Sequence, residues 1–261
     1  MILIWDTCAI NSVCRAIADY VRHSGAVDIA LTAQGGEFLS TLDELMDGLE
    51  QRCGHSSHTS ELVFDIEMDP NAVDSKLRNQ HELVESFCGQ GSFIGDWAGV
   101  LDGRIAAEPT MEDEIDELRS IIQPDPGQRD ASLIVAALKL SAETGQDCVI
   151  VTDDFPLIRR INELKRTRKE VFLGVHQYST TRITAKLSLE ILHELYISCG
   201  TDHAFWQAAI FSFTLHYPGS PEQKHQQMLL TLFENIHRDR REKELLNLGP
   251  ELEGAFGDED A

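Results

Sequence analysis

Four aspartates stand at positions where a folded chain would use carboxylates for chemistry. Asp6 directly follows the apolar run of residues 2–5, and Asp153 and Asp154 come just after a second apolar run, whereas Asp130 stands at the start of an apolar helical segment. Short continuous apolar runs indicate strands buried on both faces of a parallel sheet, and such sheets place their sites at the carboxyl ends of the strands. We therefore expect these four side chains to converge at one edge of a sheet.

Converging carboxylates predict a site for Mg²⁺ or Mn²⁺, with Asp6, Asp130, Asp153 and Asp154 as ligands. These cations prefer oxygen ligands, and carboxylates that repel one another are stabilised by a bound cation. Such a cation acidifies a bound water and neutralises charge on the leaving oxygen of a phosphate ester. Each aspartate also has a structural alternative, since Asp130 fits a helix cap and the others fit strand ends and turns.

Alternating strand-like and helical segments predict an α/β domain with a mainly parallel sheet. A helix with the apolar face Leu133, Ala136, Ala137 and Leu140 is expected to end at Gly145. Strands are expected at residues 2–5, 27–31, 62–66, 148–151 and 171–175. We expect the domain to span residues 1–180 with an insertion at about 55–125, followed by a helical extension over 181–249 and an acidic, flexible tail over 250–261.

Three segments resemble the motifs of PIN-domain nucleases, namely residues 2–7 (Ile-Leu-Ile-Trp-Asp-Thr), 130–137 (Asp-Ala-Ser-Leu-Ile-Val-Ala-Ala) and 149–154 (Val-Ile-Val-Thr-Asp-Asp). The resemblance implies a PIN-like parallel sheet flanked by helices. It also implies an endoribonuclease that hydrolyses RNA phosphodiester bonds with Mg²⁺ or Mn²⁺. Its catalytic acids would include Asp6, Asp130 and Asp154, with Asp153 at a more variable position.

The partners that the resemblance implies are RNA, with single-stranded DNA as an alternative substrate, and a second copy of the chain. The homodimer is expected from the habits of the family and from aromatic residues in the C-terminal segment. An antitoxin partner is not expected, because the separation between Asp6 and Asp130 exceeds that in the compact toxin nucleases.

The family's remaining acid is usually a glutamate in a helix after the second strand, commonly within a Glu-Leu pair. Glu44, followed by Leu45, fits this description best, and Glu37 is the reserve candidate. Thr41 and Glu44 also have the spacing of a capping box, in which Glu44 would only bond the backbone at the start of a helix. The sequence leaves both roles of Glu44 open.

Weaker candidates for substrate contacts lie beside the aspartates. Thr7 and Thr152 would position the acids through their hydroxyl groups, although a plain structural role is the simpler explanation for both. Arg159 and Arg160 follow Asp154 and would contact a nucleic-acid backbone. The alternative is that these arginines belong to a solvated helix face.

The charge balance excludes a protein that coats nucleic acid through a broad basic surface. The chain has 44 acidic residues against 22 lysines and arginines, a net charge of −22, so its mean field repels phosphate. A metal nuclease is compatible with this charge, because the cation itself faces the phosphate. The scattered cysteines, without a Cys-x-x-Cys pair, and the absence of a long apolar run predict a cytoplasmic chain that does not enter a membrane.

Two other functions fit parts of the pattern. The first is a PIN-like scaffold or interaction protein that has lost catalysis but kept its acids. The second, less favoured, is a phosphatase of the haloacid-dehalogenase kind, which needs a second aspartate two residues after the first. Cys8 occupies that position.

Overall fold

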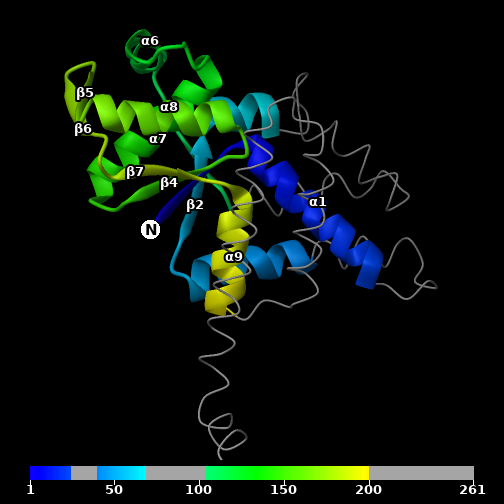
Figure 1. The fold of residues 1–261 in the computed structure, drawn as a ribbon. Helices are drawn as coiled ribbons and strands as arrows, with labels where there is room; N and C mark the ends of the chain where they lie inside the picture. The colour runs from blue at the N-terminus through cyan, green and yellow to red at the C-terminus, as the bar shows by residue number, and fades with distance from the viewer. Residues whose placement is uncertain (25–39, 69–103, 200–261) are drawn as a thin grey trace, which may run out of the picture. The chain divides into compact units, whose positions relative to one another are not determined.

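A five-stranded parallel sheet forms the centre of the computed structural model, which describes residues 1–24, 40–68 and 104–199 (Figure 1). The order across the sheet is β3-β2-β1-β4-β7, and every neighbouring pair is parallel. The strands are β1 (Ile2–Trp5), β2 (Ser56–Ser60), β3 (Ala106–Glu108), β4 (Cys148–Val151) and β7 (Ile183–Lys186). The predicted α/β class with a mainly parallel sheet is confirmed.

Helices cover both sides of this sheet. They are α1 (Thr7–Ser24), a helical segment at 40–47 that continues into η1 (Gly48–Arg52), α3 (Glu61–Val63), η2 (Phe64–Met68), α6 (Glu112–Ile121), α7 (Gln128–Thr144), α8 (Phe155–Thr167) and α9 (Ser188–Cys199). Helix α7 lies on one side of the sheet, whereas α1 and α9 pack together on the other (Figure 1). No helix within the described ranges is long and apolar enough to cross a membrane.

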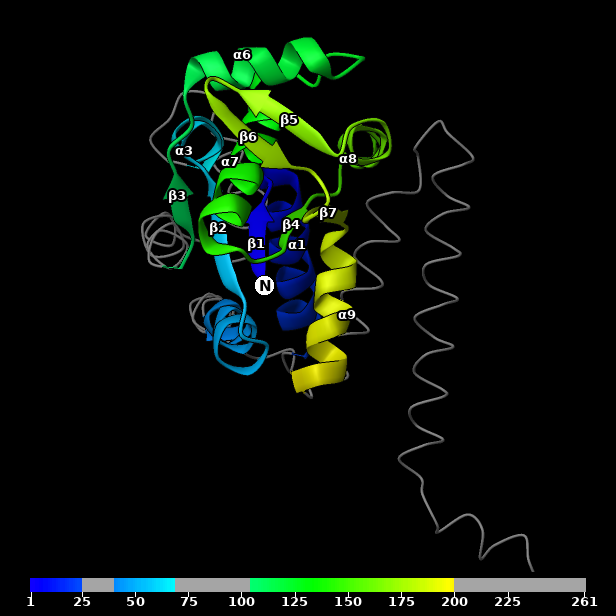
Figure 2. The ribbon, with the colours of Figure 1, turned by 90° about the vertical axis from the view of Figure 1, so that its left-hand side faces the viewer.

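The core is densest where β1 and β4 lie beneath α7. All residues of β1 and β4 are buried, as their apolar sequences predict. Residues 131–138 of α7 are buried on every side, because α6 and the antiparallel hairpin of β5 (Glu170–Leu173) and β6 (His176–Ser179) cover its outer face (Figure 2). Gly145 ends α7 as predicted, with φ of 67° and its N–H bonded to the Ser141 carbonyl. This left-handed conformation favours glycine.

Strand β2 is a polar strand in the interior of the sheet, which its sequence, Ser-Ser-His-Thr-Ser, does not suggest. Its buried polar groups are satisfied, since Thr59 Oγ1 donates to the Trp5 carbonyl at 2.8 Å and Trp5 Nε1 donates to Ser57 Oγ at 3.1 Å. Hydrogen-bonded polar groups are tolerated in a core. The strand predicted at 62–66 is wrong, because those residues are helical.

The boundaries of the predicted domain also need correction. The stretch at 55–125 contributes β2 and β3 to the central sheet, so these strands are not part of an insertion. The predicted strand at 171–175 is largely β5, which belongs to the hairpin, and the edge strand of the sheet is β7, beyond residue 180. Helix α9 packs against α1 and therefore belongs to the same unit, Met1–Phe213. The expected strand at 27–31, most of the helical extension and the acidic tail lie outside the described residues.

A buried chain of hydroxyl groups connects β2 to the start of α7. Ser60 Oγ accepts a bond from the Val63 N–H at the start of α3 and lies 2.7 Å from Ser132 Oγ, which donates to the Arg129 carbonyl. Both serines are fully buried. We predict that Ser60→Ala lowers the free energy of unfolding by about 1–3 kcal/mol.

The double-mutant cycle with Ser132→Ala, followed by urea denaturation, tests the connection itself. We expect the two substitutions to be coupled by about 0.5–1.5 kcal/mol. Additive effects, within about 0.3 kcal/mol, would show that the two hydroxyl groups act independently.

Candidate active site

A pocket of about 430 Å³ brings together acidic side chains from four separate parts of the chain. We name it the Asp6 pocket, and its lining residues are Asp6, Cys8, Glu67, Pro126, Gly127, Gln128, Arg129, Asp130 and Asp154. Asp6 and Asp154 follow the carboxyl ends of β1 and β4, which is the edge where parallel sheets place their sites. Three of the four predicted aspartates therefore lie in one pocket.

Asp6 is held rigidly by the strand next to its own. Its backbone N–H donates to the Val151 carbonyl at 3.0 Å, which continues the pairing of β1 with β4. Its Oδ2 accepts bonds from Thr152 Oγ1 at 2.6 Å and from Cys8 Sγ at 2.8 Å. Within the described part of the chain no hydrogen bond reaches Oδ1. One oxygen of Asp6 is thus used for orientation, and the other is left for a ligand.

Thr152 also positions the segment that carries Asp154. Its Oγ1 accepts a bond from the Asp154 N–H at 3.1 Å while it donates to Asp6. Asp154 is the N-cap residue of α8, yet its side chain makes no capping hydrogen bond. Asp154 lines the pocket.

Asp130 is the third residue of α7, and the N-cap of that helix is Gly127. The alternative of a simple helix cap therefore does not apply to Asp130. Its Oδ2 accepts a bond from Arg160 Nη1 at 3.2 Å, which connects α7 to α8 beside the pocket. Of the two predicted substrate-contacting arginines, Arg160 is adjacent to the site, whereas Arg159 is exposed on α8 and does not line the pocket.

Glu67 is the acidic residue of the pocket that sequence reasoning missed. It lies in η2, just after β2 and α3, and its side chain is only 2% exposed. It forms an ion pair with Arg129, from the first turn of α7. The polar sequence of β2 did not indicate a strand, so the glutamate that follows it was not predicted as a site residue.

Glu44 does not line the Asp6 pocket. It is exposed on the helix at 40–47, where its carboxylate lies 3.4 Å from Ser40 Oγ. This helix leads through η1 to the start of β2, whereas the Asp6 pocket lies at the opposite ends of the strands. The reserve candidate, Glu37, lies outside the described residues.

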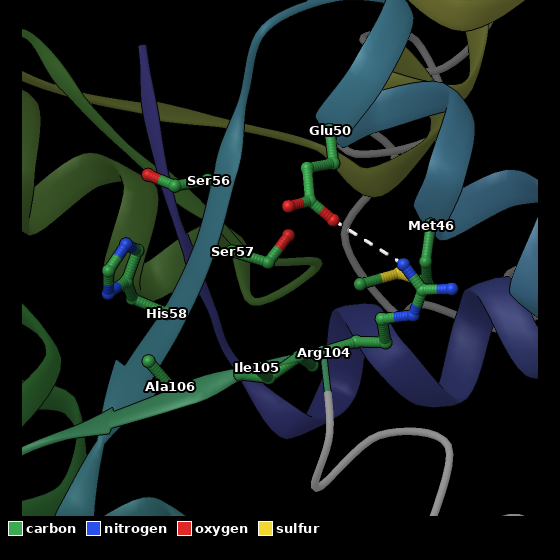
Figure 3. A pocket seen from close by; sticks show the side chains of 8 residues that line it. All are labelled: Met46, Glu50, Ser56, Ser57, His58, Arg104, Ile105 and Ala106. Carbon is green, nitrogen blue, oxygen red and sulfur yellow. Dashed lines mark hydrogen bonds and ion pairs between the residues drawn. The ribbon is translucent and has the colours of Figure 1, made fainter.

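A second pocket, of about 330 Å³, lies near the start of β2 (Figure 3). Its most prominent residue is Arg104, which pairs with Asp43 and Asp47 at 2.6 Å and with Glu50 at 3.4 Å. The same hydrogen bonds raise the pKa of Arg104 above its usual value. These acids hold the helix that carries Glu44 near β3, and they are structural partners of one arginine.

Asp153 points away from the Asp6 pocket, although it is adjacent to Asp154. Its carboxylate is buried and accepts bonds from the Ser188 N–H at 3.0 Å and Ser188 Oγ at 2.6 Å, at the start of α9. Burial raises the pKa of Asp153 to about 6, and bonds from Ser12 and Ser188 oppose this rise. The structure therefore gives Asp153 a packing role: the nearby charge of Asp6 adds to the rise of its pKa, but Asp153 does not line the Asp6 pocket.

Cys8 is a second residue of the pocket that the sequence did not single out. Burial, and then the neighbouring charge of Asp6, raise the pKa of its thiol well above the usual value, so the neutral thiol donates to Asp6. Its sulfur accepts a bond from the Asp153 N–H at 3.2 Å. Thr7, the remaining candidate, is buried next to Asp6 but does not line the pocket.

The donor set of the pocket fits a hard divalent cation. All four acids, Asp6, Glu67, Asp130 and Asp154, offer carboxylate oxygens, the ligands that Mg²⁺ and Mn²⁺ prefer. Among the described residues, no three acidic, histidine or cysteine side chains are grouped closely enough to hold an ion by themselves. Mg²⁺ is commonly held by one or two carboxylates, with water and substrate phosphate completing its shell. The pocket offers enough carboxylates for a magnesium ion that is held in this way.

The different surroundings of Asp153 and Asp154 predict different effects of the same substitution. Asp153→Ala removes two buried bonds to Ser188, so the free energy of unfolding should fall by about 1–3 kcal/mol. Asp154→Ala should lower it by less than Asp153→Ala does, because Asp154 lines the pocket and its side chain does not cap α8. In calorimetric titration with Mn²⁺, only Asp154→Ala should weaken binding in the folded protein. If instead Asp153→Ala weakened Mn²⁺ binding and Asp154→Ala caused the larger loss of stability, Asp153 would be the cation ligand and Asp154 the packing residue.

Comparison of this chain with known proteins identifies no similar protein. No family model matches the sequence, and no match is found among curated proteins or solved structures. The roles given to the residues of the Asp6 pocket therefore rest on their geometry and chemistry.

Proposed function

We propose that this chain is a metal-dependent nuclease that hydrolyses RNA phosphodiester bonds with Mg²⁺ or Mn²⁺ at the Asp6 pocket. The observation that supports this most is the convergence of four carboxylates from separate segments at the carboxyl edge of a parallel sheet. Carboxylates gathered in one pocket repel one another, and Arg129 and Arg160 pair with two of the four, so a bound cation would offset the remaining charge. A structural core has no need of such an arrangement, whereas a cation site does.

Asp6 and Asp154 are the best-placed ligands for the cation, with Asp130 beside them. Asp6 is oriented through Oδ2 by Thr152 and Cys8, and Thr152 also fixes the backbone of Asp154. One hydroxyl group thus contacts both the carboxylate of Asp6 and the backbone of Asp154. Such support by neighbouring groups commonly changes metal affinity or activity by about 10–100-fold.

When bound, the cation supplies an acidified water and neutralises charge on the leaving oxygen. In the hydrolysis, the water oxygen forms a bond to phosphorus and the bond from phosphorus to the 3′-oxygen breaks. The proton released by the water ends on the 3′-oxygen, so the products are a 5′-phosphate and a 3′-hydroxyl. A pocket carboxylate that does not hold the cation would accept a hydrogen bond from the attacking water.

RNA is the proposed substrate because of the motif resemblance around Asp6, Asp130 and Asp154, and because a cation and nearby arginines are what a phosphodiester needs. The net charge of −22 disfavours extensive binding of duplex DNA. The position of Cys8 argues against the phosphatase alternative, since its thiol donates to Asp6 where that chemistry needs a second carboxylate.

The test is cleavage of a labelled single-stranded RNA with Mn²⁺, with EDTA as the metal-free control. We expect cleavage that Asp6→Asn abolishes and that Glu67→Gln reduces by roughly 10–100-fold. The matched control is Glu44→Gln, the same change at the glutamate that lies away from the pocket, and its rate should equal that of the wild type.

Other outcomes would support other functions. Absence of cleavage together with absence of Mn²⁺ binding would favour the non-catalytic scaffold. Release of phosphate from a monoester, with RNA left intact, would favour the phosphatase. Full activity in Glu67→Gln with loss in Glu44→Gln would reverse the assignment of the fourth acid. A single-stranded DNA of the same sequence, tested in parallel, shows whether the protein distinguishes ribose from deoxyribose.

A further inference from the structure

The Asp6 pocket has two arginines whose partners are its own acids. Glu67 is paired with Arg129, and Asp130 is paired with Arg160. Both carboxylates line the pocket. In this state the positive charges of the two arginines are used to offset carboxylates, and neither arginine is engaged with a substrate.

The pair of Arg129 and Glu67 is strongly asymmetric. The Glu67 side chain is 2% exposed, whereas the Arg129 side chain is 42% exposed and itself lines the pocket. The carboxylate is therefore held inside the protein, whereas the partly exposed guanidinium is carried on a long side chain that lines the pocket. An arginine in this position can leave its partner and remain within the pocket.

The pair of Arg160 and Asp130 is similar in kind but less asymmetric. Its side chains are 19% and 26% exposed, and the atoms that join them lie 3.2 Å apart. Arg160 comes from α8, which begins just after Asp154, and Arg129 comes from α7. The two guanidinium groups thus approach the carboxylates from two different helices.

We propose that Arg129 and Arg160 are the phosphate-binding residues of the Asp6 pocket, and that a divalent cation frees them by taking over their carboxylate partners. This inference rests on the proposed nuclease function. One divalent cation carries the charge of two arginines, so the exchange keeps the charge of the pocket balanced. The planar guanidinium fork matches two oxygens of a phosphodiester, which makes phosphate the natural new partner.

This arrangement couples the cation to the nucleic acid. Without a cation, both arginines are occupied, and the strongly acidic chain repels RNA. With a cation, two additional positive groups face the phosphate backbone. Because coupling between two ligands is reciprocal, RNA should also strengthen binding of the cation.

The test measures binding of a short labelled single-stranded RNA by fluorescence anisotropy, in CaCl₂ and in EDTA, over a series of KCl concentrations. A gel run in parallel verifies that the RNA stays intact. In CaCl₂, Arg129→Gln and Arg160→Gln should each weaken binding about tenfold and lower the slope of log K against log salt by about one. In EDTA, neither variant should differ from the wild type.

A second measurement separates phosphate binding from a structural role. In calorimetric titration with Mn²⁺ alone, Arg129→Gln should bind the cation as tightly as the wild type or more tightly, because Glu67 no longer has a competing partner. The matched control is Arg166→Gln, which removes an exposed arginine of α8 paired with Glu163 and should leave both RNA and Mn²⁺ binding unchanged.

The outcomes distinguish this inference from the proposed function. A wild type that neither binds Mn²⁺ nor cleaves RNA would overturn both. A wild type that cleaves RNA, with arginine variants that keep the affinity and salt slope in CaCl₂, would overturn only the inference. Weaker Mn²⁺ binding in the variants would also overturn it, because the arginines would then position the carboxylates. If Arg129→Gln fails to fold, Arg160→Gln and Arg129→Lys replace it. Arg129→Lys keeps the charge, so it should bind RNA more weakly than the wild type with an unchanged salt slope.

Discussion

The parallel pairing of β1 with β4 determines where the chemistry of this molecule can take place. It brings Trp5 opposite Val151, so that the residues after these two strands, more than 140 positions apart in the chain, become neighbours. The bond from Thr152 Oγ1 to Asp6 Oδ2 then joins the two strand ends, and the remaining pocket acids are added by the elements packed around this edge. Loss of that pairing would separate Asp6 from Asp154.

Charge is the second constraint, because a pocket lined by four carboxylates must be offset within a chain that is already acidic. The described structure offsets them in two ways. Arg129 and Arg160 pair with two of the acids, and neutral hydrogen-bond donors, Thr152 and Cys8, hold a third. The arginine pairs are the contacts that we propose a cation replaces, whereas the fully buried Thr152 keeps its bond to Asp6. This difference suggests which contacts are permanent and which change during function.

Much of the fold could be predicted from the pattern of apolar residues in the sequence. The buried strands β1 and β4, the helix α7 and its end at Gly145 were predicted, because continuous apolar runs and a glycine stop reflect local rules. Strand β2 was not, since its buried polar groups are satisfied by partners more than 50 residues away, such as Trp5. Because β2 was not predicted, Glu67, which follows it, was not considered as a fourth acid, and the strand expected at 27–31 lies outside the described residues.

The distinction between Asp153 and Asp154 illustrates a different limit. Both follow the same strand, and neither the composition nor the spacing of the sequence indicates different roles for them. Only the location of Ser188, at the start of α9, determines that Asp153 is directed toward a helix terminus and Asp154 toward the pocket. Such a choice depends on tertiary contacts between elements that are distant in sequence.

The most direct test of the account is to locate Mn²⁺ by anomalous diffraction in crystals of the protein soaked with the ion. We expect one peak in the Asp6 pocket, within ligand distance of Asp6 Oδ1 and of at least one other pocket carboxylate, and we expect the Asp6→Asn substitution to remove it. A peak elsewhere on the sheet edge, or none at saturating Mn²⁺, would contradict the claim that these carboxylates form a cation site.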